Sequence, residues 1–179
     1  MDAVNALIEE LRTLISTSEF SVEERFKVAM NRMAGFLANA FGGEKAEVAV
    51  LWHRGDSLSF LWPDFLAEAK ELPVRSRLPI AANIFRSGSS FLDNRFMQRD
   101  HMVEYEFVKE PDGESRRIWK MMGAAITVDG ERLGVVQISR KRSAFGEPGP
   151  DFTPADLELL EKLAARLGPF MKAVIPFPL

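Results

Sequence analysis

The sequence predicts an α+β fold, with an antiparallel sheet and helices at both ends of the chain. Two hairpins are expected, turning at Gly55-Asp56 and at Asp129-Gly130, because each turn lies between apolar segments. Amphipathic helices are expected before the first hairpin, and a capped helix after the second.

Composition limits the classes of function. The 179 residues suit one domain with a core of its own, and the net charge of -3 does not favour nucleic acid or a membrane surface as a partner. The chain has no cysteine, which excludes thiol nucleophiles, disulfides and thiolate metal sites. A cytoplasmic location fits, since residues 1–17 do not resemble a signal peptide and no apolar run is long enough to span a membrane.

The first expected helix covers about residues 1–17. Four apolar residues recur along it every three to four positions, and this stripe allows two interpretations. It packs on its own domain, or it forms a seam with a second copy of the chain. The four residues are Val4, Leu7, Leu11 and Leu14.

A second helix is expected over residues 22–41. Ser21 and Glu24 have the spacing of a capping box, in which each side chain bonds the backbone N–H of the other residue. Gly42-Gly43 ends this helix, because glycine adopts the left-handed cap conformation without strain.

The strongest strand signal is residues 45–53, which are apolar on both faces and therefore suit a central strand. A second strand follows at 57–62, a short helix at 80–86 and a short strand at 90–93. Residues 94–115 have no regular period but many aromatic and methionine side chains, which is typical of lids and binding loops.

The second hairpin pairs residues 117–128 with 133–141. Thr153 is expected to cap the last helix, with Pro154 as its first residue and Asp156 as the acid of a capping box. Gly168-Pro169 is expected to end or kink that helix, and residues 170–174 to extend it by another turn.

The segments GVVQI (134–138) and FTPADL (152–157), in this order of elements, resemble a GAF domain over about residues 21–174. This divides the chain into an N-terminal helix, 1–20, for linkage or dimerisation, and a GAF-like domain, 21–179. The resemblance implies a profilin/PAS-like antiparallel sheet with the terminal helices packed on one face and a ligand-pocket cover on the other.

The resemblance also implies function: a bacterial-type, non-catalytic sensory module that binds a small molecule and acts in signal transduction, with a homodimer and a signalling protein as partners. Cyclic-nucleotide-binding members carry Asn-Lys after the hairpin and Phe-x-x-x-Asp-Glu at the last helix. Here Lys141, Phe152 and Asp156 match, whereas Arg140 and Leu157 depart, so cyclic-nucleotide binding is not expected. A salt bridge from Lys141 to Asp156 is expected, which would join the hairpin to the last helix.

Members that attach bilins or reduce methionine sulfoxide use cysteine, which this chain lacks. No metal site, cofactor or catalytic residue is predicted, because His53 and His101 have no ligand spacing and no nucleophile elbow or phosphate loop occurs. The alternative function is a ligand-free dimerisation or protein-interaction module, in which the domain's own Phe96, Met97 or Tyr105 fills the pocket.

Ligand-binding candidates come from the first hairpin, the short helix and the irregular segment, because pockets combine apolar walls with a few polar groups. They are Trp52, Phe60, Trp62, Ile84, Asp93, Phe96, Met97, His101, Tyr105 and Phe107.

Overall fold

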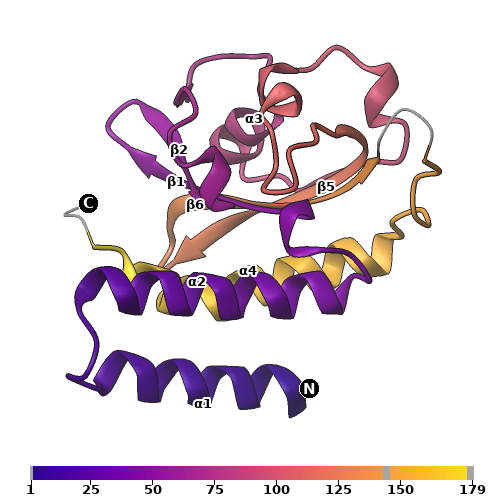
Figure 1. Ribbon diagram of the computed structural model, residues 1–179. Coiled ribbons are helices and arrows are strands. Elements are labelled where there is room, and N and C mark those ends of the chain that lie inside the picture. The colour runs from indigo at the N-terminus through magenta and orange to yellow at the C-terminus, as the bar shows by residue number, and fades with distance from the viewer. Residues whose placement is uncertain (1, 143–145, 177–179) are drawn as a thin grey trace.

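The computed structural model describes residues 2–142 and 146–176, and it arranges helices on both faces of one sheet (Figure 1). The expected domain limits at residues 1 and 179 lie outside these residues. Within them, the strands are paired in the order β3-β2-β1-β6-β5-β4, and every pairing is antiparallel. The strands are β1 (Val48–Arg54), β2 (Ser57–Trp62), β3 (Leu72–Pro73), β4 (Phe91–Asp93), β5 (Arg117–Val128) and β6 (Glu131–Arg142).

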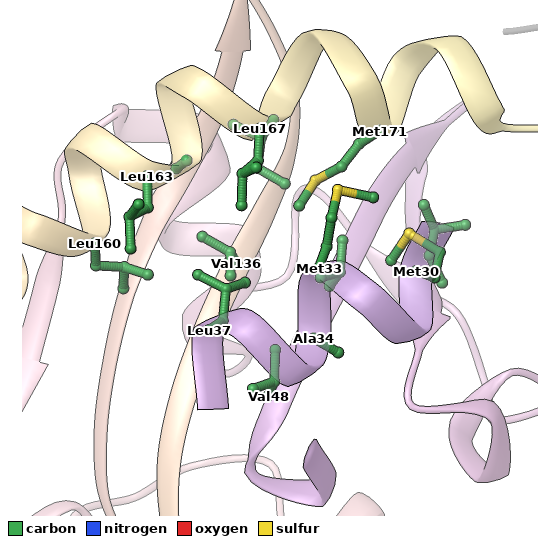
Figure 2. Close-up of a cluster of buried hydrophobic side chains, with 14 of the residues drawn as sticks. Met30, Met33, Ala34, Leu37, Val48, Val136, Leu160, Leu163, Leu167 and Met171 are labelled. Atoms are coloured by element: carbon green, nitrogen blue, oxygen red, sulfur yellow. The ribbon is translucent and has the colours of Figure 1, made fainter. Parts of the chain in front are cut away.

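One face of the sheet carries the main core. Helices α2 (Val22–Ala40) and α4 (Pro154–Val174) lie against it, and their side chains interdigitate with those of β1 and β6 (Figure 2). From α2 come Met30, Met33, Ala34 and Leu37; from α4 come Leu160, Leu163, Leu167 and Met171; and from the strands come Val48 and Val136.

Helix α1 (Asp2–Ser16) adds a further layer, on the side of α2 and α4 that faces away from the sheet (Figure 1). All four residues of its apolar stripe are buried within the chain, and Leu11 has no exposed surface. The stripe therefore packs on its own domain, as in the first of its two interpretations. It does not present a free seam to a second copy through Val4, Leu7, Leu11 and Leu14.

Both predicted capping boxes are confirmed. The Ser21 hydroxyl accepts the Glu24 N–H at 3.2 Å, and the Glu24 carboxylate accepts the Ser21 N–H at 2.9 Å. Thr153 and Asp156 make the same reciprocal pair at the start of α4, with Pro154 next to the cap. These bonds satisfy N–H groups that have no partner inside the helix.

The helix does not end at Gly168-Pro169, one of the two expected outcomes there, and the expected extension over residues 170–174 is confirmed, because α4 continues to Val174. Pro169 cannot donate to the carbonyl of Ala165, but Ala165 is exposed, so water can bond that carbonyl. A Cβ at Gly168 would lie 3.0 Å from Ile126 Cγ2 and 3.1 Å from Val128 Cγ2, so glycine lets α4 lie close to β5. Buried Leu167 and Met171 on either side keep the helix on the sheet.

The opposite face is covered by α3 (Ile80–Ser87) and by irregular segments that include short 3-10 helices (Figure 1). These are η2 (Asp64–Leu66), η3 (Phe96–Gln98) and η4 (Glu104–Phe107), while η1 (Lys45–Glu47) leads into β1. A second, smaller core lies here, around Leu51, Leu58, Ile84 and Val135. The cover expected over residues 94–115 is therefore present.

None of the helices in the described part of the chain is long and apolar enough to cross a membrane.

Gly134 provides a test of the central strand pairing. A Cβ at this position would lie 2.2 Å from the Leu51 carbonyl oxygen of β1, which is backbone and cannot rotate away. We predict that Gly134→Ala lowers the free energy of unfolding by about 2 kcal/mol or more, measured by urea denaturation. Gly35→Ala in α2 is the matched control: its Cβ meets only the flexible Lys45 side chain, and it should be neutral or stabilising. Equal effects of the two changes would contradict the close approach of β6 to β1.

Leu11 provides a test of whether α1 belongs to the folded unit. Leu11→Ala should destabilise the protein by about 2–5 kcal/mol, because it removes a side chain with no exposed surface. Leu159→Ala, on the partly exposed face of α4, should cost less than about 1 kcal/mol. If Leu11→Ala instead changed only the oligomeric state in size-exclusion chromatography, the stripe would be a dimer seam after all.

Candidate functional site

A cavity of about 70 Å³ lies between the sheet and its cover. Its floor is formed by side chains of β1, β5 and β6, and its walls by α3, η2, η3, η4 and the residues next to them. The lining residues are Ala46, Glu47, Ala49, Phe60, Pro63, Leu66, Leu72, Pro79, Ile80, Ala81, Phe96, His101, Met102, Tyr105, Glu106, Ile118, Met121, Gln137, Ser139 and Lys141.

Most of the wall is apolar, and two ring contacts shape it. The rings of Phe60 and Tyr105 pack with their centroids 4.9 Å apart, which joins β2 to the cover. Phe96 packs on His101 with centroids 4.3 Å apart, inside the cover itself. Such a wall favours a ligand with an apolar body.

The cavity also has a polar end, where charged side chains are buried on η1, η4 and β6. Glu47, Glu106 and Lys141 are each less than a tenth exposed, and Gln137 and Ser139 lie beside them on the cavity face of β6. Buried charges are costly unless they are paired, so their partners decide what this end of the cavity can bind.

Glu106 and His101 form a buried hydrogen bond within the cover, between carboxylate Oε1 and ring Nε2. The second oxygen of Glu106 accepts the backbone N–H of Ile118 in β5 at 2.8 Å, and the His101 ring contacts the Arg99 carbonyl through Nδ1 at 2.8 Å. This pair fixes the irregular segment on the first residues of β5.

Lys141 contributes the ammonium group of the polar end. Its Nζ lies 3.4 Å from Glu110 Oε1, while Arg116 Nη1 lies 2.6 Å from the other oxygen of Glu110. Burial lowers the pKa of Lys141, although the nearby carboxylates of Glu110 and Glu47 act in the opposite direction. The charged form of Lys141 is therefore incompletely compensated where it stands.

Tyr105 anchors the cover at the opposite wall. Its hydroxyl donates to the Lys70 carbonyl at 2.6 Å, and its ring lines the cavity. Burial, with a smaller effect of the Glu104 charge, raises the pKa of Tyr105 to about 12, so the phenol is neutral at physiological pH. It acts as a hydrogen-bond donor to the chain and not as a base.

A more polar hollow of about 230 Å³ adjoins the cavity and shares Ala46, Glu47 and Lys141 with it. Its other lining residues are Glu44, Glu110, Arg116 and Arg142, so carboxylates and cations alternate around it. Lys141 therefore lies at the boundary between an apolar space and a charged one.

The structure brings four of the ten predicted ligand-binding residues together around the cavity: Phe60, Phe96, His101 and Tyr105. Ile84 is close by but belongs to the core beneath α3, where its Cδ1 reaches Gly123 of β5. Whether any of these residues binds a ligand stays a prediction.

The two tryptophans lie elsewhere. Trp52 faces the helix side of the sheet, because alternate residues of β1 point to opposite faces. A register shift between β1 and β2 turns Trp62 to that side too, where Nε1–H donates to the Lys45 carbonyl at 2.9 Å. The expectation that they share a wall with Phe60 is corrected by this geometry.

Three residues of the irregular segment also lie outside the cavity. Asp93 accepts the Arg95 N–H at 2.7 Å and pairs with Arg99, so its carboxylate shapes a turn. Met97 of η3 is half-buried but is not part of the lining, and Phe107 is 68% exposed.

The predicted salt bridge between Lys141 and Asp156 does not form in the described structure. Lys141 pairs with Glu110, and Asp156 uses its carboxylate to cap α4 at Thr153. Arg140 lies nearer α4 than Lys141 does: its guanidinium packs 4.4 Å from the Phe152 ring centroid. Alternation along β6 sends the two neighbouring cations to opposite faces.

Sequence reasoning missed the floor of the cavity and much of its cover. Met121 lies on β5, Gln137, Ser139 and Lys141 on β6, and Leu66 and Ile80 in the cover. The period-2 pattern of the second hairpin could have identified the strand residues, since Gln137, Ser139 and Lys141 are every second residue.

Among the described residues, no group of His, Asp and Glu side chains could hold a metal ion.

Solved structures with this fold come from several classes of protein. The chain is similar to the GAF domain of a phosphoenolpyruvate-protein phosphotransferase from Acinetobacter (13% identity, TM-score 0.63, covering 96% of this chain and 91% of that one). It is similar to residues 122 to 287 of a methyl-accepting chemotaxis protein (17%, 0.63, 94% and 96%). It is also similar to a free methionine-R-sulfoxide reductase from Neisseria meningitidis, solved with its substrate (16%, 0.57, 97% and 93%).

The TM-scores establish the fold, and the low identities leave the ligand open. A search among curated proteins found no match. The profile of the GAF domain matches residues 47–169, which is more than half of the chain and contains the sheet, the cover and most of α4. The chain belongs to the GAF domain family, which is generally a family of sensory and regulatory domains in signalling proteins.

Proposed function

We propose that this chain is a non-catalytic sensory module that binds a small molecule in the cavity between its sheet and cover, and passes the signal on through its helices. The cavity carries the proposal, because it combines an enclosing apolar wall with a few polar groups at one end. With no cysteine in the chain, a reaction at a thiol is not available to the site.

The two faces of the sheet supply a route for the signal. On β5, Met121 lines the cavity while Met122 packs in the helix-side core; on β6, Gln137 and Ile138 divide in the same way. A ligand that orders the cover and shifts these strands would change the packing of α2 and α4. Such a shift requires that the ligand bind one arrangement of the strands and helices more tightly than the other.

The proposal includes a cytoplasmic, bacterial-type regulatory protein, a homodimer and a signalling partner. The absence of cysteine supports the cytoplasmic part. The likeness to the chemotaxis and phosphotransferase domains supports the signalling part, at the level of the fold.

A ligand-free interaction module is the alternative, and one observation favours it. Phe96 and Tyr105 of the cover occupy part of the space above the sheet, and Phe96 is only 2% exposed. In this alternative the remaining 70 Å³ holds only solvent or stays empty, and the helices act through protein contacts alone.

Native mass spectrometry of protein purified from cells tests the proposal. We expect a retained small-molecule mass, and a dimer in the same spectrum. Ala49→Leu, which extends a side chain of β1 into the cavity, should abolish the retained mass, whereas Ala165→Leu on the exposed face of α4 should keep it. Circular dichroism would check that both variants stay folded. A clean ligand-free mass, together with no response of the cavity residues Met102 and Met121 to small-molecule mixtures in methyl NMR, would favour the interaction module.

A further inference from the structure

The polar end of the cavity is short of acceptors, and its own carboxylates are already engaged. One oxygen of the Glu47 carboxylate accepts the backbone N–H of Lys141 at 2.7 Å, and the other accepts the backbone N–H of Glu44 at 3.0 Å. Glu106 is likewise occupied on both oxygens, by His101 and by the Ile118 N–H. Each oxygen of both carboxylates is therefore already bonded to a donor of the chain.

Donors at the same end are less well satisfied. The Lys141 ammonium lies 3.4 Å from Glu110, which it shares with the closer Arg116 at 2.6 Å, and 5.4 Å from the centroid of the Phe65 ring. An ammonium carries three N–H donors.

We propose that the cavity takes a small monocarboxylate, with its carboxylate on Lys141 and its apolar body against Phe60, Ile80 and Tyr105. This assignment rests on the proposed function and names the chemical class of its ligand. A carboxylate supplies the acceptors that these donors lack, and charge-assisted hydrogen bonds are the strongest that a site of this kind can make.

An anion can compensate the Lys141 ammonium, whereas the carboxylates of Glu47 and Glu106 in the same lining are each bonded to donors of the chain on both oxygens. A cationic ligand would face the Lys141 ammonium, and a neutral one would leave its charge as poorly compensated as before. Burial lowers the pKa of Lys141, and a bound anion would raise it again by stabilising the charged form. The cavity volume of about 70 Å³ limits the apolar body to a few carbon atoms.

Butyrate, butyramide and butylammonium test the class, because they share an apolar chain and differ in charge. Protein labelled at the methionine methyl groups reports the place of binding by NMR. Met102 and Met121 line the cavity, whereas Met33 and Met171 lie in the core on the helix side (Figure 2). We expect butyrate to shift the first two resonances with a dissociation constant at least about tenfold lower than that of butyramide. Butylammonium should cause no shift.

Lys141→Met tests the proposed anchor. Glu110 keeps Arg116 as a partner in this variant, so no buried carboxylate is left unpaired. Butyrate affinity should fall by about tenfold or more, while the weak binding of butyramide stays the same. Lys120→Met is the matched control: Lys120 is an equally buried lysine of the same hairpin, but it bonds the Gly149 carbonyl and Asp151 and does not line the cavity. It should leave butyrate binding unchanged, and thermal unfolding would show that both variants fold.

Butyramide binding as tight as butyrate, or unchanged butyrate binding in Lys141→Met, would overturn the carboxylate assignment. If none of the three compounds shifts Met102 or Met121, the assignment also fails. A retained mass in the native spectrum would in that case preserve the sensory function with a ligand of another class.

Discussion

The alternation of side chains along β1, β6 and β5 is the constraint on which the rest of the structure depends. These strands form the middle of the sheet and are covered on both faces, so successive residues serve different layers. Gly134 permits this arrangement at the centre, because any Cβ there would collide with the carbonyl of Leu51. A one-residue slip of β6 would exchange Gln137 with Val136 and place a polar side chain in the helix-side core.

The cover depends on a different kind of interaction. Residues 94–116 have no apolar period, and buried polar bonds attach them to the sheet: Glu106 to His101 and to the N–H of Ile118, and Glu110 to Arg116 and Lys141. Buried ion pairs are weak contributors to stability, because desolvation offsets most of their attraction. Apolar residues of similar size would fix a cover at least as well, so stability alone does not account for these charges.

Most of the fold could be predicted from the sequence, because its signals are local. The Ser21–Glu24 and Thr153–Asp156 boxes mark helix starts, and Asp129-Gly130 marks the hairpin. Whether α4 ends at Gly168-Pro169 or continues to residue 174 could not be decided from the sequence, since it depends on tertiary packing at Gly168. The site was predicted only in part for the same reason. Phe60 and Tyr105 meet across the cavity, but the register shift that turns Trp62 away, and the choice of face for Trp52, are set by pairing between distant strands.

The difference between the predicted and the observed partner of Lys141 connects the fold to the proposed function. The family resemblance predicts a salt bridge from this lysine to Asp156. Such a bond would join the hairpin to the last helix and take the lysine away from the cavity. In the structure Asp156 caps α4, and Lys141 turns to the opposite face, at the boundary between the cavity and the polar hollow. A lysine there, with a long bond to a shared carboxylate, contributes little to the attachment of α4. Its position instead gives the cavity an ammonium group whose charge a bound carboxylate would compensate.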